Sequence, residues 1–362
     1  MTTTENPPID GSRVSPDVVR KSVDDTLREF FEAKAALASG TSLAGVTAIL
    51  RDYVLSGGKR LRPLLCYCGW VAAGGTPGDP VILRAAASLE LFHAFALIHD
   101  DIMDGSDERR GRPTLHRLLE AGRATGDPER DRRFGVDSAI LVGDLAMVWS
   151  DELLHGCGAP PRVLSAVRPL LDAMRTELMF GQYEDLSTTG TGNPDLATAL
   201  SIAIYKSGKY TVERPLHIGA TLAGAEPALL DAFTAFGVPV GEAFQLRDDL
   251  LGIFGDPART GKSALADLRD GKGTALLAIA LRTAGPDQRR VLAAQVGNPR
   301  LTEDGARHVR VVLEETRAVH AVEDMIEERR GRGLAALDRV DIRAEARAAL
   351  RDLAIAATAR TA

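Results

Sequence analysis

The sequence predicts an all-α protein built as one domain. Ala, Leu, Arg and Glu, which are common in helices, are abundant, and long alternating runs of β-branched and aromatic residues are nearly absent. Apolar residues recur with helical periodicity along most of the chain, and Gly- or Pro-containing breaks separate the runs. No linker divides the 362 residues. We therefore expect residues 1–15 to be a disordered N-terminal segment and residues 16–362 to form a single domain.

The periodic segments give the expected helices in chain order. They cover residues 18–39, 43–55, 62–73, 80–103, 138–154, 166–186, 196–223, 228–254, 275–282, 286–296, 303–330 and 342–357. Residues 121–136 are charged and contain Gly, so we expect an exposed, mobile loop there.

Composition excludes several classes of function. Hydrophobic residues make up 45% of the chain and charged residues 26%, as in ordinary globular proteins. A net charge of −6 without a long basic run argues against a nucleic-acid partner. Cys66, Cys68 and Cys157 fit buried apolar positions better than a zinc site. The first residues lack an apolar signal core, and no stretch approaches the roughly 20 apolar residues of a membrane span. We therefore expect a cytoplasmic protein without a membrane span.

Three carboxylates end the most apolar predicted helix. Asp100 and Asp104 are four residues apart and face the same way, with Asp101 beside them. Such like charges repel one another and also meet the negative end of the helix dipole, so a cation must compensate them. Mg²⁺ fits, because it takes one or two carboxylates together with phosphate or water oxygens. The arginines that follow, Arg109 and Arg110, suit phosphate.

A second group of charged residues surrounds a Gly-Gly turn. Gly57-Gly58 is followed by Lys59, Arg60 and Arg62 at the start of a predicted helix. Backbone N–H groups at a helix start, joined by Lys and Arg side chains, form a phosphate or diphosphate seat. His93 lies about two helical turns before Asp100 on the same side, where it could donate to phosphate or serve as a core histidine.

A second acidic pair, Asp248 and Asp249, lies on another long apolar helix. Two carboxylates there are costly unless they are paired or bind a metal. Lys206-Ser207 lies on the helix between the two acidic motifs, and Lys262, Asp267 and Lys272 follow the second motif. Two acidic helices with several basic clusters fit one task, which is to hold diphosphates through bridging Mg²⁺ ions. An apolar cavity between the helices would then hold a hydrocarbon tail.

These motifs together resemble the trans-isoprenyl diphosphate synthases (polyprenyl synthetases), and geranylgeranyl diphosphate synthases most of all. The motifs are GGKRLRP, DDIMD followed by RRGRPT, KS, FQLRDD and GK, and their order and spacing agree over residues 46–274. The resemblance implies the isoprenoid synthase fold, long antiparallel helices around a central cavity, in a homodimer. It also implies Mg²⁺-dependent head-to-tail condensation of isopentenyl diphosphate with an allylic diphosphate, with three Mg²⁺ ions per active site.

The resemblance also implies a role for each motif residue. Asp100, Asp104 and Asp248 would bind Mg²⁺, with Asp101 and Asp249 assisting. The expected isopentenyl diphosphate ligands are Lys59, Arg62, His93 and Arg110. The expected allylic diphosphate ligands are Arg109, Lys206 and Lys262. Gln245 and Ser207 match polar positions near the reacting carbons, where the family usually has Thr in place of this Ser.

One position departs from the family pattern. Gly252 stands where the second acidic motif usually has its third Asp. The departure puts the water-mediated metal contacts of that carboxylate in doubt, and Asp256, one turn further on, is a candidate substitute.

The residues below the first motif bear on product length. Ala96 lies four residues before Asp100 and faces the pocket, while Phe95 flanks it about 7.5 Å down the helix, with Phe92 nearby. A bulky residue at position 95 followed by a small one resembles synthases that stop at geranylgeranyl diphosphate (C20). A second bulky residue at position 96 would instead indicate farnesyl diphosphate.

Three other functions remain as alternatives. The first is a farnesyl diphosphate synthase. The second is a class I terpene cyclase, which shares the ionising acidic motif but usually carries an Asn/Ser/Glu metal motif on its second helix and needs no isopentenyl seat. The third is a non-catalytic synthase subunit, which typically loses carboxylates or arginines of the first motif.

Overall fold

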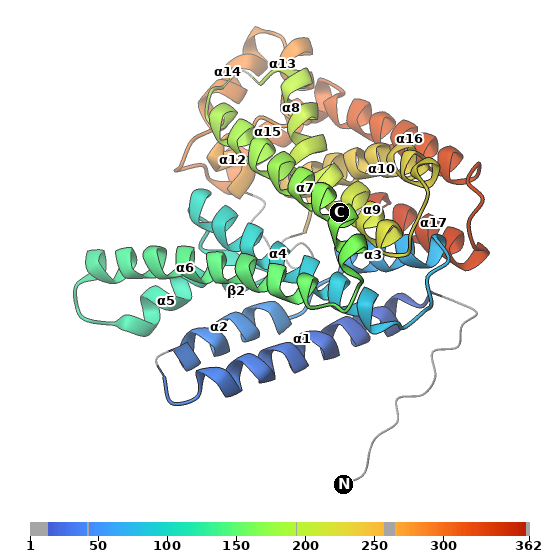
Figure 1. Cartoon of the computed structure of the whole chain (residues 1–362). Helices are drawn as coiled ribbons and strands as arrows, with labels where there is room; N and C mark the ends of the chain where they lie inside the picture. The colour runs from blue at the N-terminus through green and yellow to red at the C-terminus, as the bar shows by residue number, and fades with distance from the viewer. Residues whose placement is uncertain (1–13, 42, 193, 257–264, 360–362) are drawn as a thin grey trace.

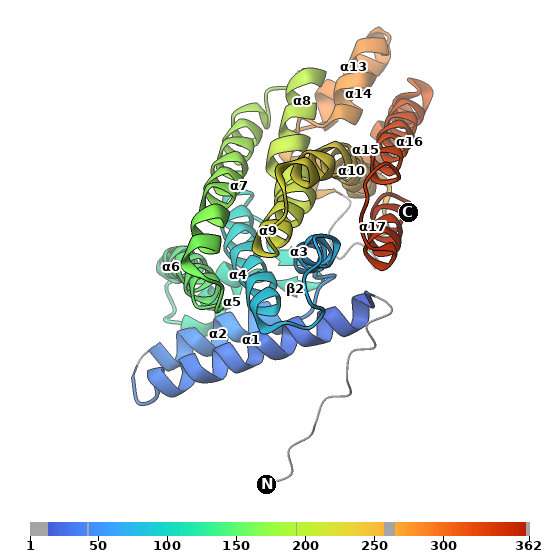
Figure 2. The same ribbon diagram turned by 45° about the vertical axis from the view of Figure 1, so that its right-hand side comes forward.

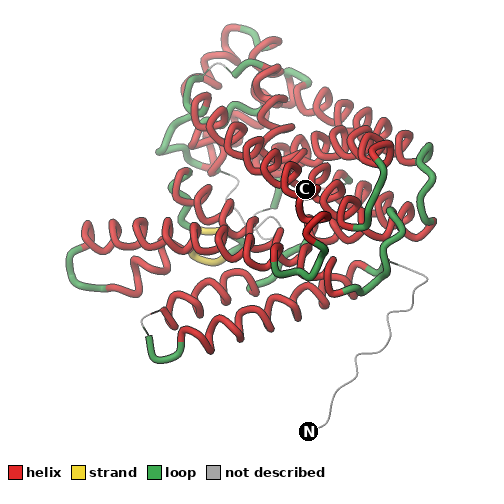
Figure 3. The backbone as a smooth tube through the Cα atoms, viewed as in Figure 1, coloured by secondary structure: helices red, strands yellow, loops and turns green. Residues whose placement is uncertain are grey.

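The computed structural model describes residues 14–41, 43–192, 194–256 and 265–359, and helices dominate them. In Figure 3 the two short strands are the only yellow segments of the described chain. The elements are α1 (Pro16–Ala38), α2 (Leu43–Leu55), α3 (Leu61–Ala72), α4 (Pro80–Met103), β1 (Glu108–Arg109), β2 (Arg112–Pro113), α5 (Leu115–Arg123), α6 (Pro128–His155), α7 (Pro161–Thr188), α8 (Leu196–Ile202), η1 (Ala203–Glu213), α9 (Arg214–Leu222), α10 (Pro227–Phe254), α12 (Ala266–Asp270), α13 (Ala275–Thr283), α14 (Pro286–Gln295), α15 (Glu303–Glu315), α16 (Ala318–Leu337) and α17 (Ala344–Thr358). The all-α prediction is confirmed.

Helix α4 is the centre of the N-terminal half. Its start is defined by Asp79, whose side chain accepts a hydrogen bond from the backbone N–H of Val81. Apolar side chains on several faces of α4, among them Ile82, Leu91 and Ile98, are fully buried. Helices α3 and α6 pack against α4, and α1 and α2 lie across its outer side (Figure 1). The buried part of α4 therefore fixes the position of its acidic C-terminal end.

Helix α10 is the centre of the C-terminal half. It packs against α16 and η1, and the view in Figure 2 shows α16 and α17 beside it. Gly241 of α10 meets Gly208 of η1 backbone to backbone, and a Cβ at either position would contact the other helix closely. This close approach brings Lys206 and Ser207 of η1 next to the part of α10 that carries Gln245.

One statement from the sequence needs correction. Helix α4 is long and apolar enough, by length and composition, to cross a membrane, although no stretch was expected to be. Inside the protein, 67% of its most apolar window is buried. The core helix of a globular protein has the same composition, and the burial of α4 accounts for its apolar character.

Three boundaries also differ from the sequence prediction. Helix α5 and the first turns of α6 occupy much of the predicted 121–136 loop, because Asp127 caps α6 and Pro128 starts it. The predicted 303–330 helix is two helices, divided at Arg317, whose φ of 59° is left-handed. The predicted 196–223 helix contains the π-helical segment η1.

A two-residue hairpin that the sequence did not indicate follows α4. Strands β1 and β2 pair Arg109 with Arg112, and the two residues between them, Arg110 and Gly111, have φ values of 56° and 70°. Positive φ at both central residues is the geometry of the tightest hairpin turns. The turn folds the arginines that follow the first acidic motif back toward it. The predicted disordered segment lies almost entirely outside the described residues.

Candidate active site

A cavity of about 880 Å³ opens between α4, α7, η1 and α10. It gathers predicted site residues from elements that are far apart in the sequence. The predicted residues that line it are Lys59, Arg62, His93, Ala96, Asp100, Arg109, Arg110, Lys206, Ser207, Gln245, Asp248 and Asp249. Both acidic motifs and both basic clusters therefore face one space.

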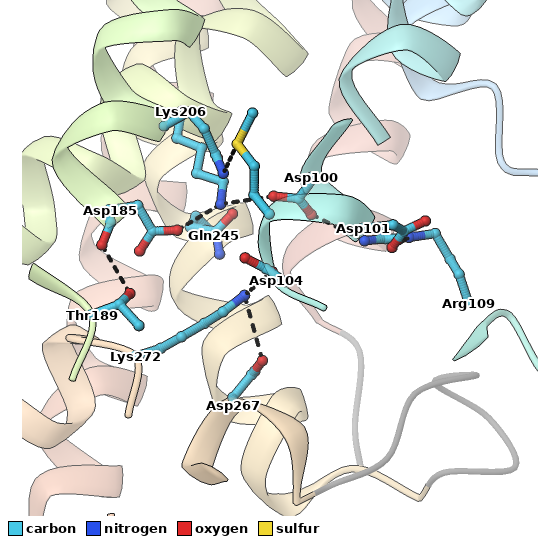
Figure 4. A network of polar contacts seen from close by, with 12 residues as sticks. Asp100, Asp101, Asp104, Arg109, Asp185, Thr189, Lys206, Gln245, Asp267 and Lys272 are labelled. Atoms are coloured by element: carbon cyan, nitrogen blue, oxygen red, sulfur yellow. Dashed lines mark hydrogen bonds and ion pairs between the residues drawn. The ribbon is translucent and has the colours of Figure 1, made fainter. Parts of the chain in front are cut away.

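The first acidic motif is surrounded by cations. Oδ2 of Asp100 lies 3.0 Å from Arg109 Nη2, and Oδ1 lies 3.1 Å from Lys206 Nζ. Asp101 is only 1% exposed and accepts a 2.6 Å hydrogen bond from Arg109 Nε, so it does not line the cavity. Asp104, also outside the lining, pairs with Lys272 at 3.0 Å. Figure 4 shows Asp100 and Asp104 at the end of α4, facing Gln245 and Lys206.

The second acidic motif lies on α10 across the cavity. Asp249 accepts a 2.7 Å hydrogen bond from Gln245 Nε2, one turn before it. The pKa of Asp249 is raised to about 7, mainly by burial and to a smaller extent by the nearby carboxylates of Asp267 and Asp248, while the hydrogen bond from Gln245 opposes these effects. An opposing cation would favour the ionised form of this carboxyl.

The expected substitute for the missing third Asp is not in place. Asp256 is exposed just beyond the end of α10 and does not line the cavity, because the chain leaves the helix at Gly255. Asp267 of α12 lines the cavity instead, and its carboxylate lies over Gly252, where it would collide with an added Cβ.

Three cavity residues, Asp185, Asp267 and Lys272, had no role in the sequence prediction. Asp185 of α7 accepts a 2.6 Å hydrogen bond from Lys206 Nζ. Lys272 Nζ lies 3.0 Å from Asp104 and 3.7 Å from Asp267. Although burial opposes their charge, the neighbouring carboxylates raise the pKa of Lys206 and of Lys272.

The basic side of the cavity combines the Gly-Gly turn with η1. Arg62 donates a 2.7 Å hydrogen bond to Thr211 and stacks over the ring of Tyr210, 4.1 Å from its centroid. His93 Nδ1 lies 3.1 Å from the Tyr210 hydroxyl. Burial, aided by Arg62 and Arg110, lowers the pKa of His93 well below its ordinary value. The imidazole is therefore neutral at neutral pH and can donate one hydrogen bond toward the cavity.

Arg60 has a structural position although it belongs to the same basic motif. Its guanidinium is 3% exposed and pairs with Glu90 at 2.6 Å and Asp24 at 2.9 Å, and it also donates to the carbonyl of Val54. The exposed Lys59 and the half-buried Arg62 remain on the cavity side. All three cations border the cavity, but the guanidinium of Arg60 is committed to its buried partners and anchors the turn.

The residues expected to set product length occupy different positions. Ala96 lines the cavity, whereas Phe95 and Phe92 do not. The two phenylalanine rings are buried against each other, with centroids 5.4 Å apart, and Phe95 also contacts His99. Phe95 therefore lies outside the cavity lining and packs against Phe92 and His99. Lys262 lies outside the described residues.

The polyprenyl synthetase family model matches residues 44–312, which include every motif discussed above. The chain belongs to the polyprenyl synthetase family. It is a trans-prenyltransferase with the isoprenoid synthase fold.

Individual relatives agree with the family assignment. A geranylgeranyl pyrophosphate synthase from Corynebacterium glutamicum, solved as a complex with isoprenyl diphosphate and magnesium, has a TM-score of 0.92 and 42% identity, covering 96% of this chain and all of that one. The geranylgeranyl diphosphate synthase of Mycobacterium tuberculosis is 32% identical over 78% of this chain and 75% of its own length. A geranylfarnesyl diphosphate synthase from Aeropyrum pernix is 31% identical over 83% of this chain and 87% of its own.

The donor set of this family member fits magnesium. All the candidate ligands are carboxylate oxygens, which Mg²⁺ prefers, and the ammonium groups of Lys206 and Lys272 already pair with two of them, Asp100 and Asp104. No cluster of three or more His, Cys, Asp or Glu ligands occurs within the described ranges. Carboxylates on facing helices, Asp100 of α4 and Asp248 of α10, suit ions that take one or two protein ligands and are completed by substrate phosphates.

Proposed function

We propose that this prenyltransferase condenses isopentenyl diphosphate head-to-tail with dimethylallyl, geranyl or farnesyl diphosphate and releases mainly geranylgeranyl diphosphate. One observation carries the proposal: both acidic motifs and both basic clusters line a single cavity. The acidic motifs suit a diphosphate bridged by metal ions, and the cluster of Lys59, Arg62 and His93 suits a second diphosphate.

The chain's own residues organise the reaction in three ways. Lys206 and Arg109 face the departing diphosphate, which takes the electron pair as the allylic C1–O bond breaks. Lys59 and Arg62 hold isopentenyl diphosphate so that its double bond reaches C1 and forms the new C–C bond. Loss of a proton from C2 of that unit to the released diphosphate completes the step. Apolar wall residues such as Leu178 and Ile202 keep water from the cation.

Magnesium would supply the remaining charge at the diphosphate. We assign three ions to the site, held by Asp100 and Asp104 from α4 and by Asp248 from α10. When bound, Mg²⁺ neutralises the charge that develops on the leaving group. The relative from Corynebacterium glutamicum that was solved with magnesium supports the choice of metal.

The product length follows from the cavity wall. Ala96 is small and lines the cavity one turn below Asp100, so a tail can pass it. Phe95 and Phe92, from the same helix as Ala96, form a buried aromatic pair outside the cavity lining. A bulky residue at position 96 would favour farnesyl diphosphate, which remains the second candidate product because farnesyl diphosphate synthases of Mycobacterium tuberculosis are 34% identical over 71% of the chain.

We also propose a homodimer that forms through α6 and α7. Leu141 and Val148, one heptad apart on α6, are 68% and 56% exposed. Phe180 and Tyr183 on α7 are 68% and 73% exposed. Exposed apolar stripes of this kind mark association sites, and identical copies can cover them reciprocally. Light scattering should give twice the chain mass, and Leu141→Glu combined with Phe180→Glu should give monomers.

The cytoplasm remains our proposed location. The three cysteines are free and buried, as in proteins from reducing compartments. Fractionation of cells that express the protein tests this assignment, and recovery in a membrane or extracellular fraction would contradict it.

Substrate omission tests the reaction class. With Mg²⁺, an allylic diphosphate and isopentenyl diphosphate together should give a longer prenyl diphosphate, and omission of either substrate should abolish it. A hydrocarbon formed from geranylgeranyl diphosphate alone would instead identify a class I terpene cyclase. A complete lack of turnover that is relieved only by a related synthase would identify a non-catalytic subunit.

A further inference from the structure

Gly252 is an unusual residue for its position. It lies inside α10, one helical turn after Asp248, and lines the cavity. Glycine inside a helix lowers stability relative to alanine, so a local requirement should explain it. The three heavy atoms nearest to an added Cβ all belong to the side chain of Asp267, and its carboxylate oxygen Oδ2 would collide with that Cβ. The space that a side chain would fill is taken by a carboxylate from another segment.

Asp267 is held in this place by its own surroundings. It lies in the first turn of the short helix α12, and its backbone carbonyl accepts hydrogen bonds from the N–H groups of Gly271 and Lys272. Lys272 Nζ lies 3.7 Å from Oδ1 of Asp267 and 3.0 Å from Oδ2 of Asp104. Figure 4 shows Asp267 below Lys272, beside α10 and on the side that faces Asp104. The carboxylate therefore lies at the cavity and is tied to the first acidic motif.

Helical geometry makes positions 248 and 252 neighbours on one face. A carboxylate placed over residue 252 is therefore close to where an Asp at that position would present its own. We propose that Asp267 supplies the third carboxylate of the second acidic motif, and that Gly252 is required because it leaves room for it. The metal-binding face is then assembled from α10 and α12. This inference rests on the proposed function, since it assumes metal ions at this face.

A comparison of four proteins tests this carboxylate exchange, in which Asp267 replaces an Asp at position 252, by Mg²⁺ binding and not by catalytic activity. Wild type, Gly252→Asp, Asp267→Ala and the double variant are titrated with Mg²⁺ in the presence of inorganic pyrophosphate, and binding is measured by calorimetry. Asp267→Ala should weaken Mg²⁺ binding about 10–100-fold, as loss of a carboxylate that supports a metal site does. Gly252→Asp should also weaken it, because the new side chain collides with the carboxylate of Asp267 and displaces it from the metal-binding face. The double variant should recover most of the affinity.

Two controls separate this role from a general loss of structure. Gly331→Ala makes the same type of change at an exposed helical glycine that has no atom within 4 Å of an added Cβ, so it should bind Mg²⁺ as wild type does. Gly252→Ala should weaken binding in the wild-type background but have little effect when Asp267 is already Ala. Thermal melting in EDTA checks that each variant is folded.

The outcomes are decisive in both directions. Wild-type Mg²⁺ affinity in Asp267→Ala, or a double variant that binds no better than Asp267→Ala, would overturn the exchange. Absence of Mg²⁺ binding by the wild type with pyrophosphate would also overturn it. If the variants show the predicted pattern of Mg²⁺ affinities while the wild type condenses no substrates, the proposed function fails and the carboxylate exchange stands. If condensation occurs without the pattern, only the exchange fails.

Discussion

Gln245 Nε2 donates a 2.7 Å hydrogen bond to Oδ1 of Asp249 across one turn of α10. The amide stabilises the ionised carboxylate but does not offset its burial, which raises the pKa of Asp249 to about 7. Without a metal, the native protein therefore retains a proton that the unfolded chain releases near pH 4.

This proton predicts the pH dependence of the metal-free protein. The contribution of Asp249 to stability is full below about pH 4 and is lost as the pH rises to about 7, because only the native state holds the proton in that range. The neutral variant Asp249→Asn lacks this loss, so its stability advantage over wild type should grow from pH 4 to 7 and then level off. Urea unfolding of both proteins in EDTA across this pH range measures the difference in their free energy of unfolding. An advantage that shrinks with rising pH would contradict the assignment.

Asp248→Ala should abolish nearly all turnover. The carboxylate faces the cavity from α10 and is assigned to a metal ion that stabilises the leaving diphosphate. Loss of such stabilisation typically lowers kcat about 10²–10³-fold. Steady-state kinetics measure the effect, with Asp256→Ala as the matched control, since that carboxylate is exposed and outside the cavity. Near-normal rates in Asp248→Ala would remove the second metal site.

Substitutions of Arg60 and Lys59, which follow the Gly-Gly turn, should have different effects on stability and on substrate binding. Arg60→Met leaves the buried Glu90 without its 2.6 Å partner, and breaking such a pair costs about 3–5 kcal/mol of stability. Lys59→Gln should change stability by less than about 0.5 kcal/mol. It should nevertheless raise KM for isopentenyl diphosphate roughly tenfold, the effect of losing one charge-assisted hydrogen bond. Melting curves and kinetics of both variants test the division, and equal stability losses would refute it.

The wall at Ala96 should control product length. Ala96→Phe places a ring in the cavity and should shift products from C20 toward farnesyl diphosphate. Phe95→Ala removes a buried ring next to Ala96 in the chain and should permit longer products, at a stability cost of about 3–5 kcal/mol. Chromatography of dephosphorylated products measures both changes. If Phe95→Ala makes nothing longer than wild type, Phe95 does not limit the chain.

The sequence predicted the long helices well because their apolar periodicity is strong. It failed where local capping outweighs composition. Residues at the start of α6 are charged and were expected to form a loop, but the Asp127 cap and Pro128 start a helix there. The break between α15 and α16 at Arg317 falls on neither Gly nor Pro, so the sequence carries no obvious helix-breaking residue there.

The motif carboxylates and cations could also be predicted, because each motif lies within a short segment of the sequence. Contacts between segments that are far apart in the sequence could not be predicted. The placement of Asp267 over Gly252 depends on how α12 returns to α10, and Asp256 was the nearer carboxylate in the sequence. Similarly, the structural role of Arg60 depends on Glu90 and Asp24, which lie on other helices.

The most direct test of the central claim is product analysis with labelled isopentenyl diphosphate, Mg²⁺ and each of the three allylic starters. The account predicts that label is incorporated into geranylgeranyl diphosphate from every starter that is accepted, and that EDTA stops incorporation. No elongated prenyl diphosphate from any starter, with folded protein and Mg²⁺ present, would contradict it.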